Sequence, residues 1–170
     1  SLTLAGMLIK EIMRLIIPRL KELLGKPVKF LDDCLGEKVE RQVAKMKPGE
    51  VILLENLRFH KEEEEGDLIF AKELAKLGDI YINDAFSASR RSHASIVGIP
   101  RFLPSGSGLL LKKEVEILSR ILEKPKRPLI AIIGGAKIST KIKVIEQFLK
   151  IADHLLLGGK IANTILTEKG

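Results

Sequence analysis

Short apolar runs alternate along the chain with longer stretches in which apolar residues recur at helical spacing. The runs lack the polar and apolar alternation of a half-exposed strand, and this is typical of strands that are covered on both faces. We therefore expect five buried strands, at Val28 to Leu31, Val51 to Leu54, Ile80 to Ile82, Leu129 to Ile133 and Leu155 to Leu157.

The longer stretches predict amphipathic helices, because apolar positions three or four residues apart lie on one side of a helix. Strand–helix–strand alternation predicts an α/β fold, with a parallel sheet and helices on its faces. The four helical patterns are Glu37 to Met46, Leu68 to Leu77, Leu109 to Leu122 and Thr140 to Ile151.

One segment interrupts this alternation. Residues Arg101 to Gly108 are rich in proline, serine and glycine, and the predicted helix after them is closed by Pro125 and Pro128. We interpret the segment as a domain boundary, with residues 1–108 in one domain, 109–124 as a connecting helix, and 125–170 in a second domain. An ordinary loop and helix inside a single domain is the alternative.

The composition excludes intrinsic disorder, because 45% of the 170 residues are hydrophobic and 30% are charged. The apolar stretch Leu2 to Leu20 is interrupted by charged residues and has no signal-peptide cleavage pattern, so we expect neither a membrane span nor a leader. We expect both chain ends, at Ser1 and Gly170, to be cuts in a longer chain. The single cysteine, Cys34, cannot form an internal disulfide and favours a cytoplasmic protein.

Positive charge is concentrated in the last third of the chain. The net charge is +7, and residues 109–170 hold 12 basic and 6 acidic groups, against 17 and 16 in residues 1–108. Such an excess indicates an anionic partner or, in the simpler alternative, a solvated basic helix face. None of the six phenylalanines or the one tyrosine alternates with basic residues, which argues against a stacking surface for single-stranded nucleic acid.

Glycines and lysines follow the last two predicted strands. Gly134 to Ala136 leads into Lys137 and Lys141, which are four residues apart and would share a helix face. Two glycines let the backbone approach a bulky anion closely, and a helix N-terminus offers it free N–H groups. Gly158-Gly159 repeats the arrangement one strand later. A tight turn with two solvated lysines is the alternative.

Arginines follow two other strands. Arg58 comes just after the second predicted strand, and Arg90, Arg91 and His93 follow the third. The planar guanidinium group binds a carboxylate or a phosphate through two hydrogen bonds. These side chains are therefore candidate substrate ligands, and surface ion pairs are the alternative for each arginine.

Other reactive side chains carry no motif. His60 and His154 lack metal-ligand spacing, so we expect structural roles for both. We expect Glu62 to Glu65 to form the acidic first turn of the helix that begins near Leu68 rather than a metal site. Two aspartates precede Cys34, and their charge would not lower its pKa. We expect no bound metal.

Four motifs in this order resemble those of the phosphoglycerate kinase family. The resemblance runs from about Leu24 to Gly170, whereas residues 1–20 do not resemble the family. It implies two doubly wound, Rossmann-like α/β domains joined by a long helix. The motifs are Leu54-Glu55-Asn56-Leu57-Arg58-Phe59, Asn83-Asp84-Ala85-Phe86 with Arg91 and His93, Gly134-Gly135-Ala136-Lys137 with Lys141, and Gly158-Gly159 with Ala162-Asn163.

The resemblance implies reversible phosphoryl transfer from 1,3-bisphosphoglycerate to Mg-ADP, which gives 3-phosphoglycerate and ATP in glycolysis. Arg58 and Arg91 would bind the phosphoglycerate, and Lys137 and Lys141 would be catalytic. Mg-ADP or Mg-ATP would be the co-substrate, with no prosthetic group. We expect no nucleic-acid or membrane partner and a cytoplasmic, monomeric parent. The implied nucleotide-binding residues are Gly134, Gly135, Ala136, Lys137, Lys141, Gly158 and Gly159.

The sequence also departs from the family pattern. The family's Asp-x-Asn-x-Pro segment, catalytic arginine, His-x-Gly-Arg-Pro segment and distal nucleotide-domain glycine loop have no counterpart here. Arg90 stands where the family usually has histidine, and Lys160 where a third glycine is usual. Residues 1–108 would be the latter part of the phosphoglycerate-binding domain, 109–124 the interdomain helix, and 125–170 the start of the nucleotide-binding domain.

These departures predict that the 170 residues alone do not turn over. Two further hypotheses remain at this point. One is a non-catalytic module that binds nucleotides or RNA through its basic half, and the other is a chain that does not fold alone.

Overall fold

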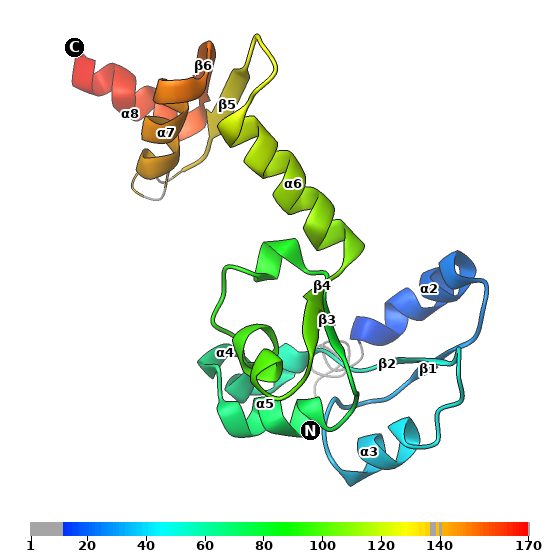
Figure 1. The fold of residues 1–170 in the computed structure, drawn as a ribbon. Coiled ribbons are helices and arrows are strands. Elements are labelled where there is room, and N and C mark those ends of the chain that lie inside the picture. The colour runs from blue at the N-terminus through cyan, green and yellow to red at the C-terminus, as the bar shows by residue number, and fades with distance from the viewer. Residues whose placement is uncertain (1–11, 137–138, 140, 170) are drawn as a thin grey trace. The chain divides into compact units, whose positions relative to one another are not determined.

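The computed structural model describes residues 12–136, 139 and 141–169 (Figure 1). The contacts divide the chain into two compact units, residues 1–112 (unit 1) and 113–170 (unit 2). The described α-helices are α2 (Ile17–Leu24), α3 (Glu37–Val43), α4 (Lys61–Glu65), α5 (Leu68–Ala75), α6 (Leu109–Glu123), α7 (Ile142–Ile151) and α8 (Gly159–Lys169). The described strands are β1 (Val28–Phe30), β2 (Val51–Leu53), β3 (Tyr81–Asn83), β4 (Ser105–Ser107), β5 (Ile130–Gly134) and β6 (His154–Gly158).

The strands confirm the predicted α/β class with parallel pairing. All five predicted strands are present, and the described strands form three two-stranded parallel sheets, β1–β2, β3–β4 and β5–β6. Among the described residues, no helix is both long and apolar enough to cross a membrane.

β4 lies in the segment Arg101 to Gly108, where the sequence analysis predicted no strand. The strand runs parallel to β3, and its pairing is extended by backbone hydrogen bonds from Tyr81 N to Pro104 O and from Gly108 N to Asn83 O. All three β4 residues are exposed. Because none is buried, no apolar residues were required there, and the strand left no hydrophobic signal in the sequence.

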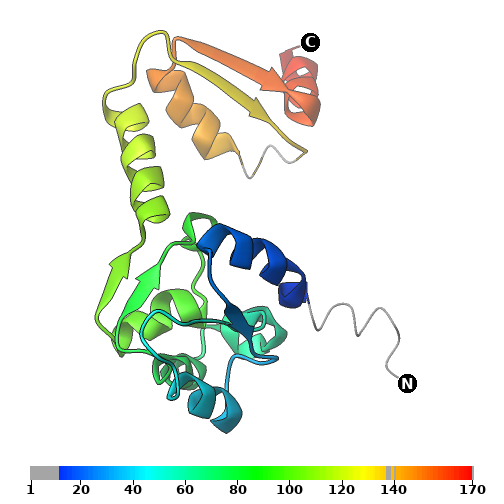
Figure 2. The ribbon, with the colours of Figure 1, turned by 90° about the vertical axis from the view of Figure 1, so that its right-hand side faces the viewer.

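The expectation that the strands are covered on both faces is wrong for β5 within this chain. In β5, Ala131 and Ile133 are buried, whereas Ile130 and Ile132 are 53% and 77% exposed. Helices α7 and α8 both pack on the face that carries Ile133 (Figures 1 and 2). An apolar run without alternation therefore does not show here that both faces are buried.

The helical predictions are confirmed for α3, α5, α6 and α7. The prediction for Glu62 to Glu65 is wrong, because these residues form the separate helix α4. Gly66 ends α4 at φ 71°, with its N–H bonded to the carbonyls of the last turn. Asp67 then starts α5 as its N-cap, accepting a hydrogen bond from Phe70 N at 2.7 Å. The glycine and the N-cap thus separate two helices, where the sequence analysis had predicted one.

The core of unit 1 forms where α5 meets a π-helical turn at Ala94–Gly98. Phe70, Ala71 and Leu74 of α5 are buried together with Cys34, Ala94 and Ile99. The two elements approach so closely that a Cβ added to Gly98 would lie 2.4 Å from the Cβ of Ala71. Glycine is therefore required at this contact.

In unit 2, a polar contact fixes the starts of β5 and β6. The Asp153 carboxylate accepts a hydrogen bond from Leu129 N at 2.6 Å and lies 3.0 Å from the Arg127 guanidinium. The hydrogen bond from Leu129 N, followed by that from Arg127, holds the pKa of Asp153 below its usual range. The small core beyond this contact is formed by Ile133, Ile145 and Ile161.

A buried carboxylate joins α4 to the π-helical turn. Glu63 is only 3% exposed, and its Oε2 accepts a hydrogen bond from Ser95 N at 2.9 Å while its Oε1 accepts one from the Ser95 hydroxyl. His93 Nδ1 lies 3.6 Å from Oε1. A buried carboxylate is stabilised only where such donors surround it.

We expect Glu63→Ala to destabilise unit 1 by about 2–3 kcal/mol, because it removes both acceptors from the donors of Ser95. Tyr81 is the only tyrosine in a chain without tryptophan and lies in unit 1. Its fluorescence during urea unfolding therefore reports on this unit. Glu64→Ala, at an exposed neighbour on the same helix, is the control and should change stability little. Equal effects of the two variants would contradict the assignment.

Candidate functional site

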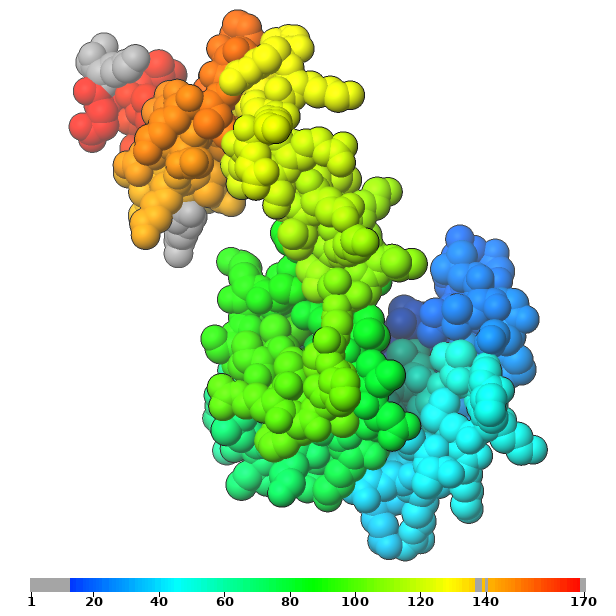
Figure 3. Space-filling model, viewed as in Figure 1, coloured from blue at the N-terminus to red at the C-terminus, as the bar shows by residue number. Residues whose placement is uncertain are grey.

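A cavity of about 480 Å³ lies in unit 1 beside the end of β2. Its walls come from Met13, the continuous stretch 53–58, Glu63 and parts of the stretch 85–96. Figure 3 shows the surface recessed where the blue, cyan and green parts of this unit meet. The cavity thus brings together two sequence motifs that lie about 30 residues apart.

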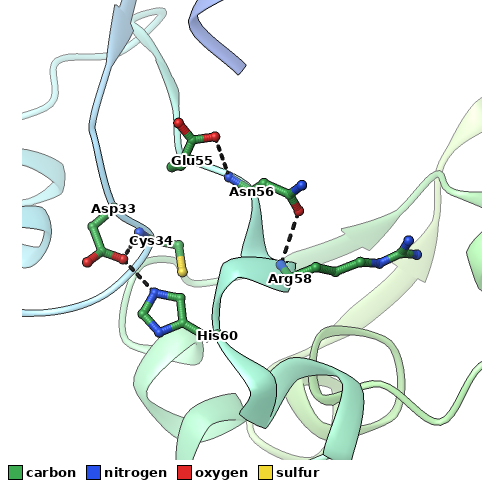
Figure 4. A network of polar contacts seen from close by, with 6 residues as sticks. All are labelled: Asp33, Cys34, Glu55, Asn56, Arg58 and His60. Atoms are coloured by element: carbon green, nitrogen blue, oxygen red, sulfur yellow. Dashed lines mark hydrogen bonds and ion pairs between the residues drawn. The ribbon is translucent and has the colours of Figure 1, made fainter. Parts of the chain in front are cut away.

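Arg58 lines this cavity from a 3-10 turn at Leu57–Phe59. The Asn56 side chain accepts a hydrogen bond from Arg58 N at 3.1 Å, and Glu55 Oε1 accepts one from Asn56 N at 2.8 Å (Figure 4). The two side chains fix the backbone of the turn, while the Arg58 side chain extends away from them and is exposed. An exposed guanidinium on a fixed backbone is suited to binding an anion.

Arg91 belongs to a segment that forms part of the same wall. Ala88 and His93 line the cavity, and a hydrogen bond from Arg91 N to Ala88 O at 2.9 Å tightens the chain between them. Arg91 is partly buried, and Arg90 is exposed. The structure therefore brings the segments of Arg58 and Arg91 to one cavity, although Arg91 itself is not among the residues that line it.

The sequence predicts His93 as a possible donor on the loop after β3, and the structure places it in the wall of the cavity. It is 8% exposed, and its Nδ1 lies 3.6 Å from the buried Glu63 carboxylate. The residue also precedes the π-helical turn, where its carbonyl accepts hydrogen bonds from Ile96 N and Val97 N. His93 therefore borders the cavity and contacts the carboxylate that joins α4 to this turn.

In unit 2, four glycines meet at the ends of β5 and β6. Gly134 and Gly158 are partners in the parallel register. Gly135 (φ 147°) and Gly159 (φ 62°) lie in the region that favours glycine, and a Cβ on Gly159 would be 3.6 Å from Gly135 O. Among the described residues, no atom lies within 4 Å of a Cβ placed on Gly158. Bare backbone at the carboxyl ends of two parallel strands, next to the start of α8, can admit a phosphate group.

The lysines of this site are only partly described. Lys137 lies outside the described residues, so the predicted shared helix face is not tested. Ala136 and Lys141 are exposed, and Lys141 is the residue immediately before α7. The structure thus shows Lys141 as an exposed positive charge at the start of α7.

Comparison with known proteins now adds to this geometry. A family model described as Phosphoglycerate kinase matches residues 9–170. The chain belongs to this family.

Individual relatives agree with the family match. A phosphoglycerate kinase of Dictyoglomus turgidum is 54% identical over 155 residues, which cover 91% of this chain and 39% of that protein. One of Moorella thermoacetica is 51% identical over 164 residues, covering 95% and 42%. The crystal structure of phosphoglycerate kinase from Pyrococcus horikoshii superimposes with a TM-score of 0.83 at 37% identity, covering 93% and 41%. The chain thus spans about two-fifths of the length of these relatives.

The family match corrects the extent of the resemblance at the N-terminal side. The sequence placed its start near Leu24 and excluded residues 1–20, but the match begins at residue 9. It therefore includes Met13, which lines the cavity of unit 1, and all of α2. From Met13 to Leu24 most residues are apolar, and most are exposed. They carry none of the polar motifs on which the resemblance was based.

A second cluster of side chains was missed by the sequence analysis. Asp33 and Cys34 follow β1, and His60 follows the 3-10 turn, yet His60 Nε2 lies 2.8 Å from Asp33 Oδ1 (Figure 4). One potential ligand atom from each of the three residues lies within 4.8 Å of the others. The spacing along the chain is 27 residues between Asp33 and His60, so no short motif could indicate the cluster.

The surroundings of Cys34 favour the protonated form of its thiol. Burial, followed by the charge of Asp33, raises the pKa of the Cys34 thiol to about 12. Partial burial by itself would raise the pKa of Asp33, but hydrogen bonds from His60 and from Cys34 N outweigh it and hold the pKa of Asp33 below its usual range. A protonated thiol next to a carboxylate is unreactive.

A further contact attaches the loop after β3 to the first turn of α6. Asp84 Oδ1 accepts a hydrogen bond from Leu111 N at 2.8 Å. Gly108 leaves room for this carboxylate, since a Cβ there would lie 2.3 Å from Asp84 Cγ. Asp84 therefore caps α6 from outside the helix, and it does so from the family's Asn-Asp-Ala-Phe motif.

We expect Asp84→Ala to destabilise the start of α6 by about 1 kcal/mol, because it leaves Leu111 N without this acceptor. Hydrogen exchange at the Leu111 amide should quicken roughly fivefold, as that energy implies. Asp84→Asn keeps the acceptor and should retain most of the protection. Asp79→Ala, in the exposed turn before β3, is the matched control. Unchanged exchange in Asp84→Ala would show that the cap contributes nothing.

Proposed function

We propose that this chain serves in a phosphoglycerate kinase, which transfers a phosphoryl group reversibly from 1,3-bisphosphoglycerate to ADP and gives 3-phosphoglycerate and ATP in glycolysis. The observation that carries the proposal is the family match over residues 9–170. We further propose a cytoplasmic and monomeric parent enzyme without a nucleic-acid partner. One relative, from Volvox carteri, is chloroplastic, so location varies within the family.

In this proposal, unit 1 binds the phosphoglycerate. The assignment of Arg58 to phosphoglycerate binding is supported by its exposed position on a fixed turn at the cavity wall. The assignment of Arg91 to the same role is supported by its position on the segment that forms this wall. Both guanidinium groups can bind phosphate or carboxylate oxygens in pairs.

Unit 2 binds the nucleotide in this proposal. The backbone at Gly134, Gly135, Gly158 and Gly159 fits a phosphate chain, because side chains are absent where it would approach. The exposed Ala136 continues that surface. Mg²⁺ would enter with the nucleotide, and its charge would neutralise phosphate oxygens there.

Lys141, together with Lys137, would stabilise negative charge on the transferring phosphoryl group. That charge is spread over three oxygens in the transition state, so positioning and neutralisation suffice and no covalent enzyme intermediate is needed. Lys141 is exposed at the start of α7, where it can reach such a group without first breaking a buried contact.

We infer that the 170 residues alone do not turn over, because the family's Asp-x-Asn-x-Pro segment and catalytic arginine have no counterpart in them. A coupled assay for ATP formation tests this directly. Turnover at rates typical of kinases by the purified chain would contradict the inference.

The phosphoglycerate site can be tested by binding. We expect 3-phosphoglycerate to bind the wild-type chain and Arg58→Ala to weaken binding roughly 10- to 100-fold, since hydrogen bonds to charged groups contribute about 1.5–3 kcal/mol. Titration calorimetry measures the change. Arg58→Lys should fall between the two, because it keeps the charge and loses the paired geometry. Arg101→Ala, at an exposed arginine of the same unit, is the control, and an equal loss there would contradict the assignment.

The nucleotide site can be tested by thermal stability. We expect ADP to raise the melting temperature of unit 2 and Lys141→Ala to reduce that shift, because a ligand stabilises only the state that binds it. Lys150→Ala, at the other end of α7, is the matched control and should keep the full shift. RNA binding with a steep salt dependence, in the absence of any ADP effect, would instead favour the non-catalytic module.

A further inference from the structure

Three side chains of different chemistry converge at the edge of the unit 1 core, apart from the residues assigned above to phosphoglycerate. They offer a carboxylate oxygen from Asp33, a sulfur from Cys34 and an imidazole nitrogen from His60. These atoms lie within 4.8 Å of one another. Figure 4 shows the Cys34 sulfur and the Asp33 carboxylate both on the side of the His60 ring.

We propose that Asp33, Cys34 and His60 bind one divalent transition-metal ion of the zinc type, with the remaining coordination position open to water. Zinc accepts sulfur, imidazole and carboxylate ligands in a single tetrahedral set. Calcium and magnesium prefer oxygen alone, so the thiol and the imidazole argue against them. The site is independent of the proposed phosphoryl transfer.

A cavity of about 230 Å³ adjoins the candidate ligands. It is lined by Asp33 and His60 together with Glu55, Asn56 and two neighbours. The cavity leaves space beside the Asp33 carboxylate and the His60 ring for an ion and for the water molecule that would complete its coordination.

Two of the three candidate ligand atoms are already close to the required separation, and the Cys34 sulfur lies within 4.8 Å of both. Asp33 Oδ1 accepts a hydrogen bond from Cys34 N at 2.7 Å, which fixes the turn after β1. The His60 ring lies against Phe70, with the ring centroids 5.4 Å apart. Tetrahedral ligands at zinc distances are about 3.3 Å apart, so His60 Nε2 and Asp33 Oδ1 need to separate only slightly from their present 2.8 Å.

Binding of the metal ion must release a proton from the Cys34 thiol. The Cys34 thiol loses its proton when sulfur coordinates the ion, and His60 binds through a neutral ring nitrogen. Asp33 is about half exposed at its side chain, so the released proton can pass to solvent there. The net reaction exchanges one thiol proton for one metal–sulfur bond, with no change in oxidation state.

Cobalt(II) serves as the probe, because it binds to the same kind of site as zinc and its complexes absorb visible light. We expect the metal-free 170-residue chain to bind one Co²⁺ and to show a thiolate-to-cobalt charge-transfer band with the d–d bands of a tetrahedral ion. Addition of Zn²⁺ should abolish both. Absence of the charge-transfer band at saturating Co²⁺ would overturn the proposal, because it would show that the sulfur is not a ligand.

Variants identify the ligands. Asp33→Asn and His60→Gln change partly exposed side chains and should weaken Zn²⁺ binding by at least about tenfold, the smallest loss seen even for outer-shell partners. Asp79→Asn and His154→Gln are the matched controls at exposed positions and should bind as the wild type does. Binding that survives His60→Gln unchanged, or that falls equally in the controls, would overturn the site.

Cys34→Ser should remove the charge-transfer band. Cys34 is 1% exposed within the core, so this variant must first be shown to fold by circular dichroism. If it does not fold, the wild-type spectrum and His60→Gln still decide the matter. Binding of 3-phosphoglycerate by wild type and by His60→Gln, measured in parallel, separates failure of the metal site from failure of the proposed kinase function.

Discussion

The buried carboxylate of Glu63 is the contact on which the architecture of unit 1 depends. Its two strand pairs, β1–β2 and β3–β4, are separate sheets, so no strand-to-strand hydrogen bonding joins them among the described residues. Glu63 links α4, which follows the β2 motif, to Ser95, which follows the β3 motif. The cavity that carries Arg58 has Glu63, His93 and Ser95 in its wall. The shape of the candidate site therefore depends on the same carboxylate.

Polar residues after the strands mostly satisfy the backbone of the turns. Asp33, Asn56 and Asn83 each accept a hydrogen bond from a backbone N–H one or two residues further on. Their side chains are thus used locally, as is common for aspartate and asparagine in turns. The arginines contribute in a different way, because a guanidinium has no acceptor and cannot cap these donors. This division explains why fixed turns present exposed positive charge at the cavity.

The positions of helices and strands could be predicted from the sequence better than the burial and the contacts of their residues. Strands such as β2 and helices such as α7 follow from local hydrophobic spacing, which is recorded in neighbouring residues. β4 could not be predicted, since Ser105–Ser107 is exposed and is defined only by backbone pairing with β3. The exposed face of β5 could not be predicted either, because the burial of each face of the strand depends on where α7 and α8 pack, and the strand's own residues do not record this. Motif order indicated Arg58 and the glycines, whereas the contact of His93 with Glu63 joins residues that lie far apart in the sequence and follow no motif.

The Asp33–His60 contact and the Arg58 site share one short segment, residues 55–60. Its backbone is held by Asn56 and by the 3-10 turn, in which His60 N donates to Leu57 O at 3.1 Å. Arg58 and His60 extend from this turn in different directions (Figure 4). One hydrogen-bonded turn thus positions both the candidate anion ligand and the candidate metal ligand. Because the two side chains diverge from this turn (Figure 4), each site can be occupied without using the ligands of the other.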